Sequence, residues 1–234
     1  MTQNSPGAQT HILDNAAWAA LAGPQASIAE VFGSARRFPI DVSPFGAIEN
    51  RNNPECWRDL AHLVGSGGHI VLTGAGAIEI PVDWEELGGG TGKQMTGESV
   101  MGQADPDAIP LGLNDVPEML DLISRTEPGP FLPRTVELGG YLGFRIDGAL
   151  VAMAGRRLNP PGWVEISAVC TDPAYRGRGL GGRLVNAVAA GIRAEGATPF
   201  LHVSESNENA IRLYENLGFQ IRIRGTFKVL KAPE

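Results

Sequence analysis

A glycine- and arginine-rich stretch over residues 172–182 constrains this chain more than any other feature. It reads Asp-Pro-Ala-Tyr-Arg-Gly-Arg-Gly-Leu-Gly-Gly and lies between an apolar stretch and an amphipathic one. Four glycines in six residues cost backbone entropy unless something gains from the missing side chains. Bare N–H groups at a helix start form an anion pocket, and Arg176, Arg178 and Arg183 add positive charge. The stretch therefore predicts a phosphate- or pyrophosphate-binding turn between a strand and a helix.

Strand and helix patterns alternate on both sides of this turn. The expected strands are residues 109–111, 143–146, 149–154, 163–171 and 199–203, followed by a closing hairpin of 219–223 and 226–230. The expected helices are residues 116–124, 181–194 and 209–217. Asp147-Gly148 predicts a tight hairpin turn. The order β-α-β-β-β-α-β-α-β-β predicts an α+β (mixed α/β) domain over residues 106–234.

The first half of the chain, residues 1–105, predicts a smaller α/β domain. Expected helices cover residues 14–21, beginning at Asp14, and 54–64, with Pro54 in the first position. Expected strands are residues 69–73 and 77–80, a flexible turn is expected at 88–92, and a linker is expected at 102–108. The glycine-rich residues 88–92 fail the phosphate-loop pattern, because Gln94 stands where Ser or Thr is required.

Two motifs of the second half resemble the GNAT N-acetyltransferase superfamily. Arg176-x-x-Gly179-x-Gly181 is similar to the acetyl-CoA pyrophosphate loop of that family. A second block, Asn207-x-x-Ala210-x-x-x-Tyr214-x-x-x-Gly218-Phe219, is similar to another family motif at the expected distance. The resemblance covers about residues 109–230 and implies a GNAT acyl-CoA N-acyltransferase fold there. The N-terminal domain is then expected to complete the acceptor pocket or to be a degenerate GNAT-like half.

The resemblance implies that acetyl-CoA is the co-substrate. The pantetheine arm would pair with the backbone of Val169, Cys170 and Thr171. The pyrophosphate would lie on Arg176, Gly177, Arg178, Gly179, Leu180, Gly181 and Gly182. The N–H of Val169 would stabilise the oxyanion of the reacting thioester. Asn207 is expected to be either a helix N-cap or a cofactor ligand.

The resemblance also implies direct attack of a primary amine on acetyl-CoA in a ternary complex. An alkylammonium has a pKa of about 10.4, so a group must accept its proton. Glu165 stands where histone-acetylating members have their glutamate base, and His202 stands where ribosomal-protein-acetylating members have a glutamate. Glu165, His202 and solvent all remain candidates for this base. Tyr214 matches the family tyrosine and is expected to protonate the leaving thiolate.

Composition and charge exclude several classes of binding partner. A net charge of −7 disfavours nucleic acid, and no apolar run approaches the ~20 residues of a membrane helix. The first seven residues lack a signal-peptide pattern, and Cys56 and Cys170 have neither disulfide-framework nor zinc spacing. We expect a cytoplasmic protein that binds no metal and acts on a small-molecule or peptide amine.

Two other classes of function compete with this hypothesis. A non-catalytic acyl-CoA-binding or regulatory module would need the same cofactor grip. A nicotinamide-dinucleotide-binding enzyme is the other alternative, because Gly177-x-Gly179-x-x-Gly182 also satisfies the dinucleotide fingerprint.

Overall fold

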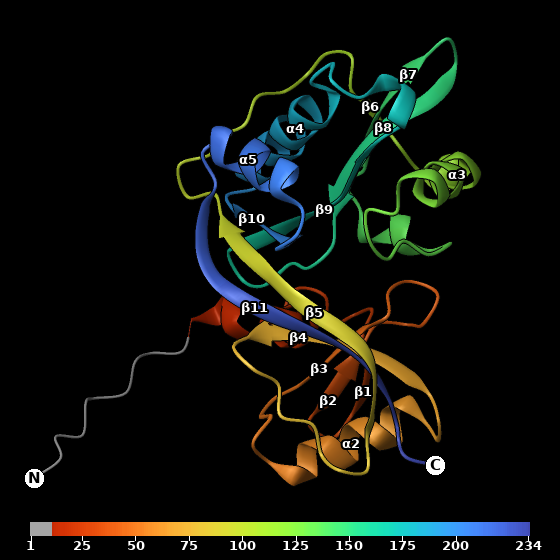
Figure 1. Cartoon of the computed structure of the whole chain (residues 1–234), viewed down its shortest axis with the longest axis vertical. Coiled ribbons are helices and arrows are strands. Elements are labelled where there is room, and N and C mark those ends of the chain that lie inside the picture. The colour runs from red at the N-terminus through yellow and green to blue at the C-terminus, as the bar shows by residue number, and fades with distance from the viewer. Residues whose placement is uncertain (1–10) are drawn as a thin grey trace, which may run out of the picture.

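One mixed sheet runs through the described part of the chain. The computed structural model describes residues 11–234, so the signal-peptide expectation lies outside the described residues. Within them, eleven strands form a sheet of order β1-β2-β3-β4-β11-β5-β10-β9-β8-β7-β6. Figure 1 shows two lobes, with the long strands β5 (Glu85–Thr96) and β11 (Gln220–Lys231) crossing between them.

The upper lobe in Figure 1 follows the order predicted for the second half of the chain, apart from its end. Its strands are β6 (Ile109–Pro110), β7 (Leu142–Ile146), β8 (Ala149–Arg156), β9 (Trp163–Thr171) and β10 (Thr198–Ser204). Its helices are α3 (Val116–Thr126), α4 (Leu180–Ala194) and α5 (Glu208–Asn216). Asp147 and Gly148 have φ of 51° and 85°, as the predicted tight hairpin turn requires.

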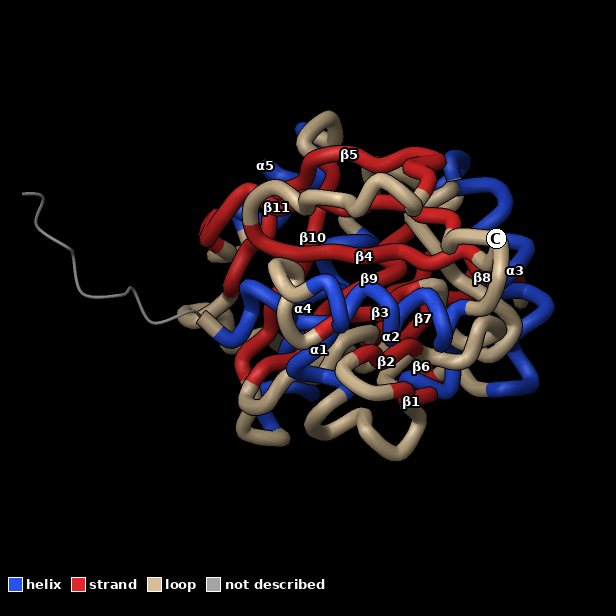
Figure 2. The backbone as a smooth tube through the Cα atoms, turned by 90° about the horizontal axis from the view of Figure 1, so that it is seen from below, coloured by secondary structure: helices blue, strands red, loops and turns tan. Residues whose placement is uncertain are grey.

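The lower lobe is built from the first half of the chain. It contains a 3₁₀ turn (Ile12–Asn15), α1 (Ala16–Leu21), β1 (Glu30–Phe32), β2 (Ala35–Arg37), β3 (Phe45–Ile48), α2 (Pro54–Val64) and β4 (His69–Ala75). The α2 prediction is confirmed, because Pro54 takes the first position and Gly65 ends the helix with φ of 84°. Figure 2 shows β4, the last strand of this lobe, beside β11, which lies beside β5.

The two lobes repeat one order of elements. Each has a helix, three antiparallel strands, a second helix, and a strand parallel to the third: α1, β1, β2, β3, α2, β4 and α3, β7, β8, β9, α4, β10. Each lobe then pairs with a last strand from the other half, β4 with β11 and β10 with β5. This shared order is what the degenerate-half hypothesis predicts. The proposed boundary between residues 105 and 106 lies in the connection from β5 to β6.

The predicted closing hairpin was wrong. Residues 220–231 form the single strand β11, and Gly225 pairs with Ala75 on one side and with Gly92 on the other. The glycine therefore permits close pairing in a central strand, and no turn forms around it. In the N-terminal lobe, the helix expected to begin at Asp14 is a 3₁₀ turn followed by α1.

The predicted flexible turn at residues 88–92 was also wrong, because these residues lie inside β5. A Cβ on Gly89 would lie 2.5 Å from the carbonyl oxygen of Phe227, and one on Gly90 would lie 3.0 Å from the Phe227 ring. The glycines thus let β11 approach β5 closely. The strand expected at residues 77–80 does not form, whereas residues 102–108 are the irregular connection that was predicted.

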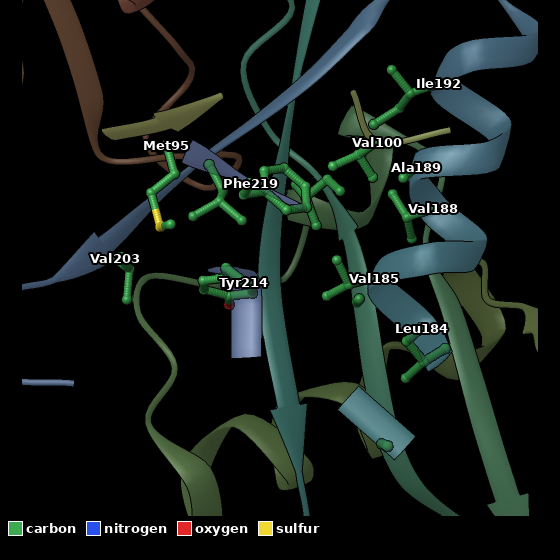
Figure 3. Packing of buried hydrophobic residues seen from close by; sticks show 14 of the residues in the cluster. Met95, Val100, Leu184, Val185, Val188, Ala189, Ile192, Val203, Tyr214 and Phe219 are labelled. Carbon is green, nitrogen blue, oxygen red and sulfur yellow. The ribbon is translucent and has the colours of Figure 1, made fainter. Parts of the chain in front are cut away.

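The core of the upper lobe lies between α4 and the sheet. Figure 3 shows Leu184, Val185, Val188 and Ile192 of α4 pointing into this core. Met95 of β5 belongs to the same cluster, so the first half of the chain contributes to the core of the second half. No helix in the described range 11–234 has the length and apolar character needed to cross a membrane.

Candidate functional site

The neighbouring parallel strands β9 and β10 separate part of the way along their length. Their register begins at Trp163 and Thr198 and ends where Ile166 faces Leu201. Both strands continue beyond this point, β9 to Thr171 and β10 to Ser204. The sheet therefore opens between their carboxyl ends.

A β-bulge in β9 accompanies this opening. Ser167 faces Gly155 of β8 and Cys170 faces Met153, so two residues of β9 oppose one residue of β8. One of the two, Ala168, has a φ of 53°, a left-handed conformation that is rare outside glycine. A bulge of this kind redirects the following residue, which here is Val169.

A cavity of about 680 Å³ occupies the opening. Its walls include predicted site residues from β9, the turn, β10 and α5: Val169, Cys170, Thr171, Arg176, His202, Asn207 and Tyr214. The lower lobe contributes Phe45, Val71, Thr73 and Gly74. Half of the predicted site residues thus share the cavity with a second wall, from the lower lobe, that no sequence motif indicated.

The glycine-rich turn has the backbone geometry expected of an anion site. Gly177 and Gly179 have φ of 76° and 75°, and Gly179 is the N-cap of α4. A Cβ on Gly182 would lie 3.2 Å from Leu213 Cδ1, so this glycine lets α4 pack against α5. The N–H groups of Leu180 and Gly182 lie in the first turn of α4, where they have no partner within the helix.

The arginines of the turn have different roles. Arg176 lines the cavity and donates from Nε to the carbonyl oxygen of Thr171 at 3.3 Å. Arg178 stacks over the Tyr175 ring, 5.0 Å from its centroid. The expected contribution of Arg183 to the anion pocket was wrong, because its guanidinium forms ion pairs with Asp105 and Asp107 in the preceding connection, each at 2.7 Å.

Glu165 and His202 are brought together by the parallel pairing of β9 and β10. Glu165 is fully buried, and its Oε1 lies 2.7 Å from His202 Nδ1. Arg157 donates to both carboxylate oxygens, from Nε at 2.8 Å and from Nη2 at 2.6 Å. Burial opposes ionisation of Glu165, but the charges and hydrogen bonds of Arg157 and then His202 outweigh it, and its pKa falls to about 2. Sequence reasoning missed Arg157, because no local pattern marks it.

The other ring nitrogen of His202 faces Gln94 of β5, at 3.0 Å between Nε2 and Nε2. Gln94 Nε2 also donates to the carbonyl oxygen of Leu13 at 2.9 Å, and its Oε1 accepts from Arg222 Nε. Arg222 in turn donates to Asp14 Oδ1 at 2.6 Å. A polar side-chain network therefore crosses β11, β5, β10 and β9.

Tyr214 and Asn207 lie on the α5 side of the cavity. Tyr214 is 7% exposed, and burial raises its pKa to about 12, so its phenol stays protonated near neutral pH. Tyr214 also lines the cavity, where its phenol can meet a ligand. Asn207 is the N-cap of α5 and accepts from the Ala210 N–H at 3.1 Å.

In the part of the chain that the structure describes, the two cysteines and the other titratable residues define no metal centre. In the described range, no group of three or more His, Cys, Asp or Glu side chains is placed to hold a metal ion. Both cysteines are free and buried. Burial raises the pKa of Cys170 to about 11, so its thiol stays protonated.

The matching place in the lower lobe is filled by the protein itself. In the lower lobe β3 pairs in parallel with β4, and residues 49–53, which connect β3 to α2, contain no glycine. From this segment, Arg51 donates to the carbonyl oxygen of Thr73, and its own carbonyl accepts from Trp57 Nε1 at 2.9 Å. A Cβ on Gly74 would lie only 2.1 Å from the Arg51 guanidinium. Arg51 therefore occupies the lower-lobe counterpart of the opening between β9 and β10.

The fold and the cavity are those expected of an acyltransferase. Comparison with known proteins identifies the family. The family model described as FR47-like protein matches residues 141–227. A solved structure of a putative acetyltransferase of the GNAT family from Novosphingobium aromaticivorans is 39% identical, with a TM-score of 0.88. The match covers 96% of this chain and 100% of that one. This chain therefore belongs to the GNAT family.

Curated relatives match between a third and two fifths of the chain. N-alpha-acetyltransferase RimI of Mycobacterium tuberculosis is 41% identical over 83 residues, 34% of this chain and 51% of that protein. Mycothiol acetyltransferase of Mycobacteroides abscessus is 37% identical over 99 residues, 41% of this chain and 30% of that protein. The matched region thus spans about half, or less, of these relatives.

Proposed function

We propose that this protein transfers the acetyl group of acetyl-CoA to a primary amine by direct attack in a ternary complex. The observation that carries the proposal is the cavity between the separated ends of β9 and β10. It brings Val169, Arg176, His202 and Tyr214 to one space. Acyl transfer needs the functions that these residues offer: a cofactor grip, an oxyanion donor, a base and an acid.

Acetyl-CoA would lie along β9 and across the glycine-rich turn. The backbone of residues 169–171 would pair with the pantetheine arm in the space that β10 vacates. The pyrophosphate would accept from the N–H groups of residues 177–182 and from the guanidinium of Arg176. A protein of net negative charge can bind a pyrophosphate in this way, because the positive potential would be local to the turn.

The bulge in β9 would supply the oxyanion donor. Val169 follows the left-handed Ala168 and has no register partner in β8 or β10. Its N–H would donate to the thioester oxygen as the amine nitrogen attacks the carbonyl carbon. The C–N bond forms, the C–S bond breaks, and Tyr214 gives its phenolic proton to the sulfur. Solvent then reprotonates the tyrosinate.

His202 is the better candidate for the base. Glu165 is buried, bound at both oxygens by Arg157, and has a pKa of about 2, so it is a weak proton acceptor near neutral pH. His202 is partly exposed and lines the cavity, with Glu165 at its Nδ1. An ammonium acceptor loses two protons, and His202 would pass both to solvent in turn, with Glu165 orienting the imidazole. Because solvent returns one proton to the Tyr214 phenolate, one proton is released for each acetyl group transferred.

The acceptor would occupy the part of the cavity walled by the lower lobe. Phe45, Val71 and Thr73 lie there, and Glu127 contributes a carboxylate from the segment after α3. Glu127 has a left-handed φ of 45°, an unusual conformation for a residue other than glycine. A carboxylate at this wall would attract an ammonium group. A small-molecule or peptide amine with an apolar portion fits this composition best.

A thiol-release assay tests the proposal. The protein would be incubated with acetyl-CoA and a panel of α-amino acids, short peptides and alkylamines, and product acetylation would be checked by mass spectrometry. We expect thiol release that depends on both amine and enzyme. Tight binding of acetyl-CoA with no turnover on any amine would instead support the non-catalytic module. A thermal shift with NAD and none with acetyl-CoA would support the dinucleotide enzyme.

A further inference from the structure

We propose that Gln94 is a positioning residue that orients the His202 imidazole and fixes its tautomer, with the proton on Nδ1. The geometric part of this proposal concerns the free protein and stands without the proposed function. Its consequence for the rate rests on the proposed acetyl transfer. Gln94 lies on β5 and comes from the half of the chain that carries no family motif.

The contacts of Gln94 fix which way its amide points. It is 2% exposed, and its Oε1 faces the donor Arg222 Nε while its Nε2 faces the acceptor Leu13 O at 2.9 Å. Reversing the amide would put two donors against each other at Arg222 and two acceptors against each other at Leu13. The second N–H of the amide therefore points at His202 Nε2, 3.0 Å away.

This orientation decides the tautomer of His202. An N–H donor at 3.0 Å requires Nε2 to be the acceptor, so the imidazole proton is on Nδ1. Nδ1 then donates to Glu165 Oε1 at 2.7 Å. Both ring nitrogens are satisfied in one neutral form, and protonation of Nε2 would place two N–H groups face to face.

The groups around His202 act in opposite directions. Glu165 on β9 favours the imidazolium, although Arg157 neutralises much of that carboxylate. Gln94 on β5 favours the neutral ring, and Arg222 on β11 adds a positive charge behind it, itself paired with Asp14. The network therefore engages both ring nitrogens of His202 in the ligand-free protein. Accepting the proton at Nε2 requires the Gln94 amide to withdraw.

This network gives the first half of the chain a part in the chemistry. Leu13 and Asp14 precede α1. Gln94 lies on β5, the strand from the first half of the chain that pairs with β10. Replacing Gln94 by Glu would change the atom that faces His202 from a donor to an acceptor. A carboxylate there stabilises the imidazolium.

Nitrogen-15 NMR of the ligand-free protein tests the proposal directly. The His202 signals are identified among those of the four histidines by their loss in a His202→Gln variant. The ring nitrogen shifts of His202 are then followed from pH 5 to 9. We expect the parent protein to show Nδ1 protonated and Nε2 unprotonated. In Gln94→Glu the midpoint of the His202 titration should rise by at least about one pH unit, a tenfold gain in proton affinity. Gln220→Glu adds the same charge at an exposed position of β11 and should shift the midpoint by less than about 0.3.

Either of two results would overturn the proposal. One is an Nε2-protonated neutral ring in the parent protein, a measurement that needs no Gln94 variant to fold. The other is a folded Gln94→Glu protein whose His202 titrates like the parent. If the amine panel yields turnover, the acidic limb of its pH–rate profile should move with the NMR midpoint. If no amine is acetylated, the NMR result still decides the role of Gln94 by itself.

Discussion

Replacing Glu165 by Gln should destabilise the protein strongly, and by an amount that depends on pH. The carboxylate is fully buried and bound at both oxygens by Arg157, with His202 as a third donor. Gln has one acceptor oxygen in place of the two carboxylate oxygens that accept from Arg157, and its NH₂ group would face a donor. Removing one partner of a buried ion pair typically costs about 3–5 kcal/mol.

The lowered pKa of Glu165 gives the size of this destabilisation in a second way. A fall from the ordinary value of 4.5 to about 2 corresponds to about 3 kcal/mol of the free energy of unfolding at pH 7. Because the pKa is lowered on folding, this contribution is complete above pH 4.5 and is lost as the pH falls through 2. At pH 3 the same relation leaves about 1.4 kcal/mol.

Urea unfolding followed by circular dichroism measures both quantities. The difference in unfolding free energy between the parent and Glu165→Gln should be about 3 kcal/mol at pH 7 and should shrink toward pH 3. Glu195→Gln is a matched control, because Glu195 pairs with Arg156 at a largely exposed position and should cost less than about 1 kcal/mol. A cost for Glu165→Gln no larger than that of the control, or one that is flat with pH, would refute the reasoning.

Three further predictions concern the cavity. Tyr214→Phe should lower kcat about 10- to 150-fold, the value of a hydrogen bond of about 1.5–3 kcal/mol to a developing charge. Calorimetry should show the affinity of this variant for acetyl-CoA unchanged. Glu127→Gln should raise KM for the amine about fivefold, equal to about 1 kcal/mol for an ion pair at an exposed carboxylate, without changing KM for acetyl-CoA in steady-state assays. Isothermal titration should give one acetyl-CoA per chain, because Arg51 fills the lower-lobe counterpart of the site, and a stoichiometry of two would contradict that role.

The elements with strong local patterns could be predicted from the sequence. The strand at residues 163–171 matches β9, and the helix from Pro54 ends at Gly65 as expected. The glycine-rich turn was placed correctly because its left-handed glycines and helix start are local properties. Its neighbour Arg183 was misassigned, because its acidic partners lie 76 and 78 residues away in sequence.

The parts that depend on distant strand pairing could not be predicted. The glycines at residues 88–92 and at position 225 have the composition of turns, yet they let β5 and β11 approach each other at the centre of the sheet. For the site, Glu165 and His202 were both singled out, but their contact with each other was not expected. Gln94 and Arg222 were missed because they reach His202 only through the register of four strands.

The most direct test of the central claim is a crystal structure of the protein soaked with coenzyme A. We expect the diphosphate above residues 177–182 and the pantetheine chain beside residues 169–171, with its sulfur near Tyr214. Finding the nucleotide outside the gap between β9 and β10, for instance at Arg51 in the lower lobe, would contradict the account.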